Sequence, residues 1–226
     1  AGSLGYPSIA AHGHADALSV GMAFRGDWWL VDPGTYCYHT EPVWRDYFRG
    51  TGAHNTVLIN EQDQSRIGGA FLWLKHARVS CSEVIREGNG NAQVSGSVTG
   101  CANGGAKHNR LLQYKPKHFR LEIVDTVEDV SSSDFFEVRF HFHPDVHVEH
   151  IDENLFGAHH TKHSGVLGIE VDSKLRWRVA CSETDPNLGW YSETLGHKVP
   201  CSVLVGRAEC RYTMSSAATI DWSDLV

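Results

Sequence analysis

Long apolar runs are absent from the 226-residue sequence. A membrane-spanning helix needs roughly 18 or more consecutive apolar residues, whereas the longest apolar stretches here have the length of single strands. We therefore expect no membrane span. An initiator Met and a signal peptide are also absent at Ala1. Because the most distinctive polar residues follow almost at once, we expect the sequence to begin inside a longer protein.

A surplus of basic residues is absent as well. The 20 Lys and Arg residues are outnumbered by 27 Asp and Glu residues, which gives a formal net charge of −7. This balance argues against a dominant basic surface for nucleic acid. An anionic substrate would have to be bound by a local group of cationic side chains.

Closely spaced cysteine pairs are also absent. The six cysteines are widely separated and form no CxxC pair, which argues against a zinc site built from cysteines. An even number of cysteines permits disulfides, but a chain of this length buries enough apolar surface to fold without them. The sequence leaves the redox compartment open.

Helical periodicity and fixed-length repeats are the last notable absences. No amphipathic helix of three turns is visible, although residues 44–51 suit one short helical turn. The lack of a repeat argues against a β-propeller. Apolar and polar residues instead alternate in segment after segment, separated by turns rich in Gly, Asn and Asp. We predict an all-β fold, with residues 1–226 forming a single large antiparallel β-sandwich of jelly-roll type.

The first predicted hairpin joins a strand at residues 17–24 to a second strand at residues 27–32, with its turn at Arg25-Gly26-Asp27. Just before it, the stretch AAHGHADALS (10–19) carries His12, His14 and Asp16 at alternate positions. If these residues extend the strand, the three side chains share one face. The pattern alone leaves a metal site, a catalytic site and a polar edge open.

The sequence contains 15 histidines, and histidine is both the commonest metal ligand and the side chain that titrates nearest neutral pH. His14, Asp32 and His54 would supply two imidazoles and a carboxylate, a donor set that suits Zn²⁺. The alternative is that Asp32 caps the DPG turn and the histidines are surface residues. His12 is a candidate general acid or base, or another surface histidine.

Residues 35–53 form a long aromatic loop, and a loop of that length inside a compact domain is more often functional than not. Its aromatic rings suit either sugar stacking or packing, and its arginines suit carboxylates or sulfates. The candidate substrate-binding residues are Tyr36, Trp44, Arg45, Tyr47 and Arg49. A second histidine-rich stretch, HFHPDVHVEH at 141–150, is interpreted as structural because it continues a predicted strand.

Three segments, in this order, resemble one known family: AAHGHADALSV, WWLVDPGTYCY and WRDYFRGTGAHNTVLINEQDQS. Together they look like the C-terminal β-sandwich of the heparinase II/III-like polysaccharide lyases. The resemblance is strong over residues 4–75 and weaker, though compatible, beyond them. Those lyases cleave uronic-acid glycosides by β-elimination, so the resemblance implies an anionic uronate polysaccharide or oligosaccharide as substrate.

The resemblance also implies roles for single residues. His12 matches the active-site histidine that faces the substrate. His14, Asp32 and His54 match the ligands of a zinc ion that is mainly structural. The aromatic and arginine residues of the loop at 35–53 would line the substrate side, and Asp16 inherits no role.

The family places an α/α toroid before the sandwich, and that toroid supplies a catalytic tyrosine. No such helical region occurs in this sequence, so we expect the chain alone to be inactive or nearly so. By resemblance the parent protein is periplasmic or secreted. Two alternatives stay open: a non-catalytic carbohydrate-binding sandwich that keeps a structural zinc and, ranked last, a cupin-like metal oxygenase or isomerase. Heparin, heparan sulfate, alginate and a bacterial exopolysaccharide all remain open as substrates.

Overall fold

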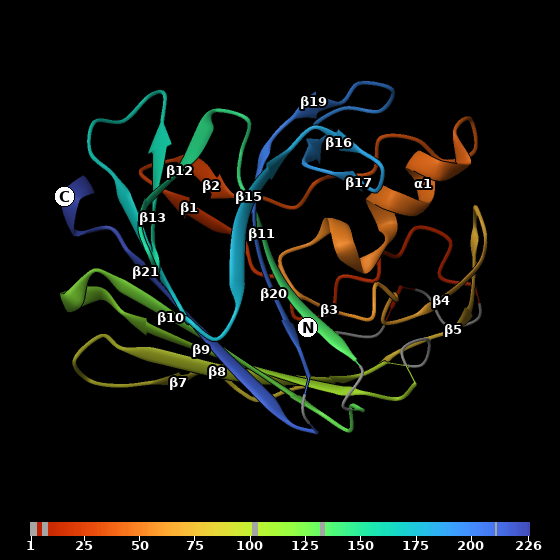
Figure 1. The fold of residues 1–226 in the computed structure, drawn as a ribbon, viewed down its shortest axis with the longest axis horizontal. Helices are drawn as coiled ribbons and strands as arrows, with labels where there is room; N and C mark the ends of the chain where they lie inside the picture. The colour runs from red at the N-terminus through yellow and green to blue at the C-terminus, as the bar shows by residue number, and fades with distance from the viewer. Residues whose placement is uncertain (1–3, 6–8, 101–103, 132–133, 211) are drawn as a thin grey trace.

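The computed structural model describes residues 4–5, 9–100, 104–131, 134–210 and 212–226. Two antiparallel sheets pack face to face, and the smaller sheet lies in front of the larger one in Figure 1. The predicted β-sandwich is confirmed. Within the described ranges, no helix is long and apolar enough to cross a membrane.

The larger sheet has nine strands in the order β12-β13-β14-β21-β10-β9-β8-β6, and β7 also pairs with β8. Most neighbours are consecutive hairpins, whereas β21 returns from the C-terminus to lie between β14 and β10. The strands are β6 (Arg78–Cys81), β7 (Ile85–Arg86), β8 (Ala92–Thr99), β9 (Lys107–Lys115), β10 (Arg120–Glu128), β12 (Val146–Asp152), β13 (Leu155–His160), β14 (Leu167–Val171) and β21 (Met214–Asp221).

The smaller sheet has four strands in the order β15-β20-β11-β3. Its strands are β3 (Val57–Ile59), β11 (Phe135–His141), β15 (Arg176–Cys181) and β20 (Ser202–Glu209). Four two-stranded pairs surround it: β1 (Met22–Phe24) with β2 (Asp27–Leu30), β4 (Arg66–Gly69) with β5 (Leu72–Lys75), β16 (Glu183–Thr184) with β17 (Asn187–Leu188), and β18 (Trp190–Tyr191) with β19 (Val199–Pro200).

In the part of the chain that the structure describes, helical structure is confined to short segments. The helix α1 (Pro42–Arg49) begins with a proline at its first turn, where the missing N–H is not needed. The 3-10 helices are η1 (Thr51–Ala53), η2 (Pro116–His118) and η3 (Ser223–Leu225). α1 corresponds to the single helical turn expected near residue 44, and it lies at the right-hand end of the sandwich in Figure 1.

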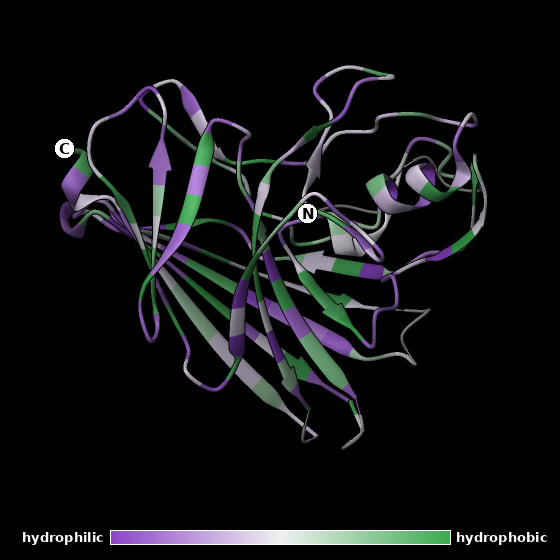
Figure 2. Ribbon diagram, turned by 45° about the horizontal axis from the view of Figure 1, so that its top comes forward, coloured by the Kyte–Doolittle hydropathy of each residue, from purple (hydrophilic) through white to green (hydrophobic). Residues whose placement is uncertain are grey.

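Alternation along the strands builds the core between the two sheets. Ile123 and Val127 of β10 and Phe136 and Phe140 of β11 are almost completely buried in one cluster. Polar residues occupy many of the positions between them, which gives the alternating colours along the strands in Figure 2. Burying one face of each sheet is the dominant stabilising contribution in such a fold.

The predicted hairpin is confirmed: β1 and β2 are antiparallel, and Phe24 pairs with Asp27 across a two-residue turn. Arg25 and Gly26 both have positive φ, as a type I′ turn requires. The first strand is shorter than predicted, because β1 starts only at Met22. Residues 10–16 form turns, a bend and irregular backbone rather than a strand, so the expected alternation of His12, His14 and Asp16 on one strand face is wrong.

Candidate functional site

The segment that carries His12 and His14 is an irregular loop held by side chains from elsewhere in the fold. Gln64 receives the N–H of Ala17 on its amide oxygen and donates to the carbonyl of Ala17. The indole of Trp73 donates to the carbonyl of Gly13 at 3.0 Å. Backbone N–H and C=O groups of a loop need such partners because they have no strand to pair with. The side chains of Gln64 and Trp73 therefore fix the path of this loop.

Asp32 lies just beyond β2, in a turn that needs a glycine. Its Oδ1 accepts the N–H of Gly34, whose φ is +84°. Gly34 also forms a parallel bridge with Ser192, so close that a Cβ added at Gly34 would lie 2.0 Å from the Ser192 carbonyl oxygen. The Pro-Gly turn therefore brings the chain near residue 192 against the end of β2.

His54 reaches Asp32 from the segment that follows η1. Its Nδ1 lies 2.8 Å from Asp32 Oδ2, and the His54 side chain is fully buried. The His14 ring lies 5.3 Å from the His54 ring, measured between centroids. One ligand atom from each of the three residues lies within 4.8 Å of the others. We call His14, Asp32 and His54 the Asp32 cluster.

The electrostatics of the Asp32 cluster favour an ionised Asp32 and a neutral His14, the forms that bind a metal, whereas they favour the protonated form of His54. Burial, together with the nearby His54, lowers the pKa of His14 to about 4. Burial alone would raise the pKa of Asp32, but the hydrogen bond and charge of His54, the N–H of Gly34 and the nearby His14 together outweigh it and lower that pKa to about 2. Burial also opposes protonation of His54, yet its contact with Asp32 raises the pKa of His54.

Asn55, which sequence patterns did not single out, connects the Asp32 cluster to the segments that flank the β1–β2 hairpin and to β11. Its side-chain amide donates to the carbonyls of Val20 and Val31 at 2.8 and 2.9 Å. Its side-chain oxygen accepts the N–H of His141. The next residue, Thr56, donates to the carbonyl of Ala17 at 2.8 Å, so consecutive polar residues after His54 hold the loop.

Arg110 of β9 connects the same region to the larger sheet. It donates from Nη1 to the carbonyls of Leu18 and Asn55, and it forms a buried two-point ion pair with Asp125 of β10. His108 also contacts Asp125, at 2.7 Å. The sequence offers one sign of this network: Asp125 occupies a core-facing position of the alternating strand β10.

His12 lies on the exposed side of the loop. It lines an open pocket of 330 Å³ together with His14 and Asp16. Its ring meets the ring of Tyr38 edge-on at 5.3 Å, and Tyr38 stacks on the exposed Phe71 at 6.0 Å. The structure thus brings the predicted catalytic residue next to the predicted metal ligands, with one imidazole facing solvent.

The predicted aromatic substrate-binding residues lie together around α1. Tyr36, Trp44 and Tyr47 pack with Phe48, and burial raises the pKa of the Tyr47 phenol. The ammonium of Lys198 lies 4.3 Å from the Tyr36 ring centroid and 4.2 Å from that of Trp44. This aromatic cluster is an internal packing unit with a partly exposed Trp44, and its substrate contacts stay a prediction.

The predicted substrate-binding arginines, Arg45 and Arg49, are completely buried. Arg45 donates to the carbonyls of Ala11 and Ala70, and Arg49 donates to Ala70 and to Asp46. Their guanidinium groups therefore support the backbone next to His12. Their sequence position suggested direct contact with a substrate. Their complete burial does not support that prediction.

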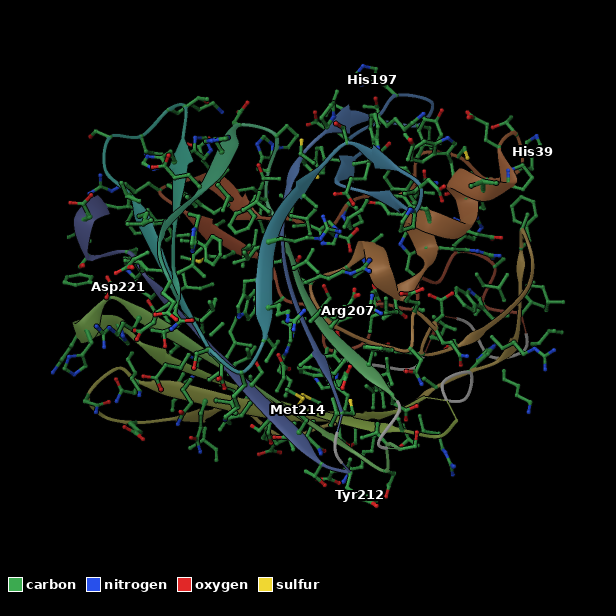
Figure 3. The ribbon with its side chains drawn as sticks, viewed as in Figure 1. His39, His197, Arg207, Tyr212, Met214 and Asp221 are labelled. Carbon is green, nitrogen blue, oxygen red and sulfur yellow. The ribbon has the colours of Figure 1, made fainter. Side chains whose placement is uncertain are left out.

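A larger pocket of 1380 Å³ lies elsewhere, along the outer face of the smaller sheet. Arg207 projects there from β20 (Figure 3) and forms ion pairs with Glu61 and Glu137. Arg139 is likewise paired with Glu137. Size does not make this pocket the site, because these charges are neutralised in pairs and the Asp32 cluster lies outside its lining.

The histidines of the second rich stretch are divided by the structure. His141 ends β11 and is fully buried, with its N–H on Asn55. Its burial lowers its pKa well below the ordinary value. His143 lies beyond the strand end and faces His160 and Tyr191. The structural interpretation fits His141, whereas His143 belongs to a separate group of histidine and aspartate side chains.

Comparison with solved structures finds the same fold in a heparinase III and in a heparan sulfate lyase. The chain aligns with a heparinase III solved with methylated lysines (TM-score 0.73, 16% identity, 93% of this chain and 30% of that one). It also aligns with the heparan sulfate lyase HepC from Pedobacter heparinus (TM-score 0.72, 14% identity, 93% of this chain and 31% of that one). The chain therefore spans about a third of the length of these structures.

Sequence comparison agrees with the structural likeness. No curated protein sequence matches significantly. The profile of the family described as "Heparinase II/III-like, C-terminal" matches residues 1–223, which is nearly the whole chain. The resemblance suggested by the three sequence segments is confirmed, and the chain belongs to the heparinase II/III-like C-terminal family.

Proposed function

We propose that this chain is the zinc-binding C-terminal domain of a polysaccharide lyase that cleaves uronic-acid-containing polysaccharides by β-elimination. The observation that carries the proposal is the arrangement at residues 12–14. The exposed His12 lines the same pocket as His14, which is one of the three residues of the Asp32 cluster. The structurally similar HepC from Pedobacter heparinus is a heparan sulfate lyase, which supports the same class of reaction here.

The proposed reaction needs a proton carrier at the sugar. A base removes the proton α to the uronate carboxylate, the C4–O bond breaks, and a C4=C5 double bond forms. An acid then protonates the departing 4-oxygen. His12 serves as one of these proton carriers, because its imidazole is exposed in the pocket and histidine is the commonest general acid or base. The toroid domain of the parent protein supplies a tyrosine as the other.

The residues of the Asp32 cluster fit a zinc ion. Two imidazoles and one carboxylate, with ligand atoms within 4.8 Å, form a donor set that zinc prefers. Among the described residues, His54 Nε2 has no hydrogen-bond partner although it is buried. When bound, zinc supplies structural cross-linking of the loop to β2. The protein residues then hold His12 toward the pocket.

A substitution at His12 in the full-length protein tests the catalytic part. We expect His12→Ala to lower formation of the unsaturated product by at least about 100-fold, the typical contribution of a general acid or base. Zinc content should be unchanged. His197, an exposed histidine at a loop tip (Figure 3), provides the matched control His197→Ala. Full activity in His12→Ala would move the chemistry to other residues.

Metal analysis tests the zinc part separately. We expect zinc to co-purify with the protein, and we expect His14→Ala to lose it and to melt at a lower temperature. Metal binding to the folded state alone stabilises that state by mass action. Unchanged metal content and melting temperature in His14→Ala would remove the zinc assignment.

A second candidate function is non-catalytic carbohydrate binding with the same structural zinc. The stacked pair of Tyr38 and Phe71 favours it, because 43% of Phe71 is exposed and flat aromatic faces stack on sugar rings. Binding of uronate oligosaccharide by the full-length protein without any unsaturated product would select this function. Periplasmic or extracellular location of the parent protein accompanies either proposal.

A further inference from the structure

A second group of histidine and aspartate side chains lies at the other end of β2. Asp27 is the first residue of this strand, whereas Asp32 follows its last residue. His160 ends β13, and His163 lies in the turn that follows. One ligand atom from each of Asp27, His160 and His163 lies within 4.8 Å of the others. We call these three residues the Asp27 cluster.

The Asp27 cluster repeats the chemistry of the Asp32 cluster. One imidazole pairs directly with the carboxylate, since His163 Nε2 lies 2.9 Å from Asp27 Oδ2. The His160 and His163 ring centroids are 5.0 Å apart. The corresponding separations in the Asp32 cluster are 2.8 and 5.3 Å. Two imidazoles and a carboxylate therefore converge twice, once at each end of one short strand.

The floor of the Asp27 cluster is apolar. The fully buried Trp29 lies 5.1 Å from the His160 ring and stacks on His163 at 5.9 Å, between ring centroids. Burial and the neighbouring His163 lower the pKa of His160, which favours its neutral imidazole. Neutral imidazole is the form that binds a metal.

Further ligand atoms lie beside the cluster. His143 and Asp145, together with His160, form a second set whose ligand atoms lie within 4.8 Å of one another. The His143 and His160 rings are nearly parallel, 6.3 Å apart. His160 is thus shared by two overlapping sets, and Asp145 or His143 is placed to complete a four-coordinate site.

Three existing contacts compete with a metal, and the first is the hydrogen bond between His163 and Asp27 itself. Lys162 donates from its ammonium to Asp27 at 3.0 Å, but 58% of the Lys162 side chain is exposed, and exposed ion pairs contribute little. His160 Nδ1 also accepts the backbone N–H of Lys162 at 3.1 Å. A metal on His160 Nε2 would move the imidazole proton to Nδ1 and break the hydrogen bond from Lys162, and a metal on His163 Nε2 would replace its hydrogen bond to Asp27.

We infer that Asp27, His160 and His163 form a second transition-metal site, suited to Zn²⁺ or another divalent ion that prefers nitrogen and carboxylate ligands. The metal joins the turn of the β1–β2 hairpin to the turn after β13. If the Asp32 cluster also holds a metal, metal ions connect β2 to neighbouring segments at two places, at its first residue and just after its last residue. This site is independent of the proposed lyase function.

Metal counting tests the inference. The purified protein is stripped with a chelator, reloaded with Zn²⁺, dialysed and analysed for bound metal, and Co²⁺ absorption bands then report the ligand type. We expect two equivalents per chain, one for each cluster. His160→Ala and Asp27→Asn should each lose one equivalent. His159→Ala is the matched control, because His159 is an exposed neighbour paired with Glu149, and it should keep both.

The variants also separate this inference from the zinc proposed for the Asp32 cluster. Asp27→Asn changes one partly exposed side chain, and circular dichroism checks that it is folded. If Asp27→Asn loses one equivalent of metal and His14→Ala keeps that equivalent, the metal is bound at the Asp27 cluster. This result would support the inference even if the Asp32 cluster binds no metal. Unchanged metal content in both Asp27→Asn and His160→Ala overturns the inference. The Asp27 cluster would then be a group of ion pairs that binds no metal.

Discussion

At the scale of single residues, Asn55 is the side chain on which the candidate site depends most. It bonds three backbone groups that lie on separate segments, and it is completely buried. Removing a buried hydrogen-bonding group leaves its partners without water or protein to replace it. The residue therefore determines where the loop and the end of β2 lie relative to each other.

We expect Asn55→Ala to lower the free energy of unfolding by about 3 kcal/mol, since three backbone groups lose a partner at about 1 kcal/mol or more each. Metal affinity at the Asp32 cluster should fall as well, because His54 is adjacent in sequence. Urea unfolding and zinc titration measure the two effects. Asn89→Ala, in an exposed turn, is the control and should change the free energy by less than about 0.5 kcal/mol.

Gly34 and Gly26 allow conformational strain to be separated from steric contact. Both have positive φ, +84° and +89°, so an alanine is strained at either position. Only Gly34 of these two faces a backbone oxygen, that of Ser192, whereas nothing lies within 4 Å of a Cβ at Gly26.

We expect Gly26→Ala to cost about 1 kcal/mol and Gly34→Ala clearly more, because strain and the Ser192 clash both apply to the second change. Thermal unfolding of the two variants measures the difference. Equal melting temperatures would mean that the segment at residue 192 moves away freely, and that its bridge to Gly34 does not hold the end of β2.

At the scale of elements, the buried pairing of β9 with β10 predicts a pH dependence of stability. Burial lowers the pKa of His108, despite the opposing effect of Asp125. Burial alone would raise the pKa of Asp125, but the charge of Arg110 and the contact with His108 hold it well below its usual range. In both cases the unfolded chain binds protons that the folded chain does not.

Stability from these groups is therefore fully present above the unfolded pKa values and is lost as pH falls. The loss begins below about pH 6.5 for His108 and below about pH 4 for Asp125, the ordinary values of their unfolded forms. We expect His108→Gln to make the loss of unfolding free energy between about pH 6.5 and 5 shallower, as measured by urea unfolding. His147→Gln, at an exposed position on β12, should leave the slope unchanged. If His108→Gln also leaves the pH dependence of the unfolding free energy unchanged, His108 is not the group that causes it.

Sequence patterns predicted elements well where one face of a strand is buried. The alternation in β10 follows directly from Ile123 and Val127 facing the core. Patterns failed at residues 10–16, where alternate polar residues suggested a strand. The loop there exists because Gln64, Trp73 and Arg45 satisfy its backbone from distant positions, and no local pattern encodes those contacts.

At the scale of the whole molecule, the family resemblance carried more information about the site than residue spacing did. Spacing alone left His14, Asp32 and His54 as one option among several, because residues so far apart in the chain meet only through the fold. The burial of Arg45 and Arg49 was not predictable, since a charged residue in an aromatic loop is normally exposed. Their position beneath the loop at 10–16 results from tertiary packing of α1.

We expect the chain of residues 1–226 alone to form little or no unsaturated product from a uronate polysaccharide, because the proposed reaction takes its second proton carrier from a toroid domain. Ultraviolet absorbance of the unsaturated sugar measures this. The full-length protein assayed at the same concentration is the positive control. Turnover by residues 1–226 at the full-length rate would show that the sandwich carries a complete active site.

Arg110 also has a consequence for the order of folding. It extends from β9 of the larger sheet to the carbonyls of Leu18 and Asn55, and Asn55 lies just before β3 of the smaller sheet. Asn55 in turn bonds β11. Contacts between residues this distant in sequence form late, after the local hairpins. We therefore expect the ligands of the Asp32 cluster to reach their final positions only when the two sheets have docked, so that the proposed metal would bind after docking and would not nucleate folding.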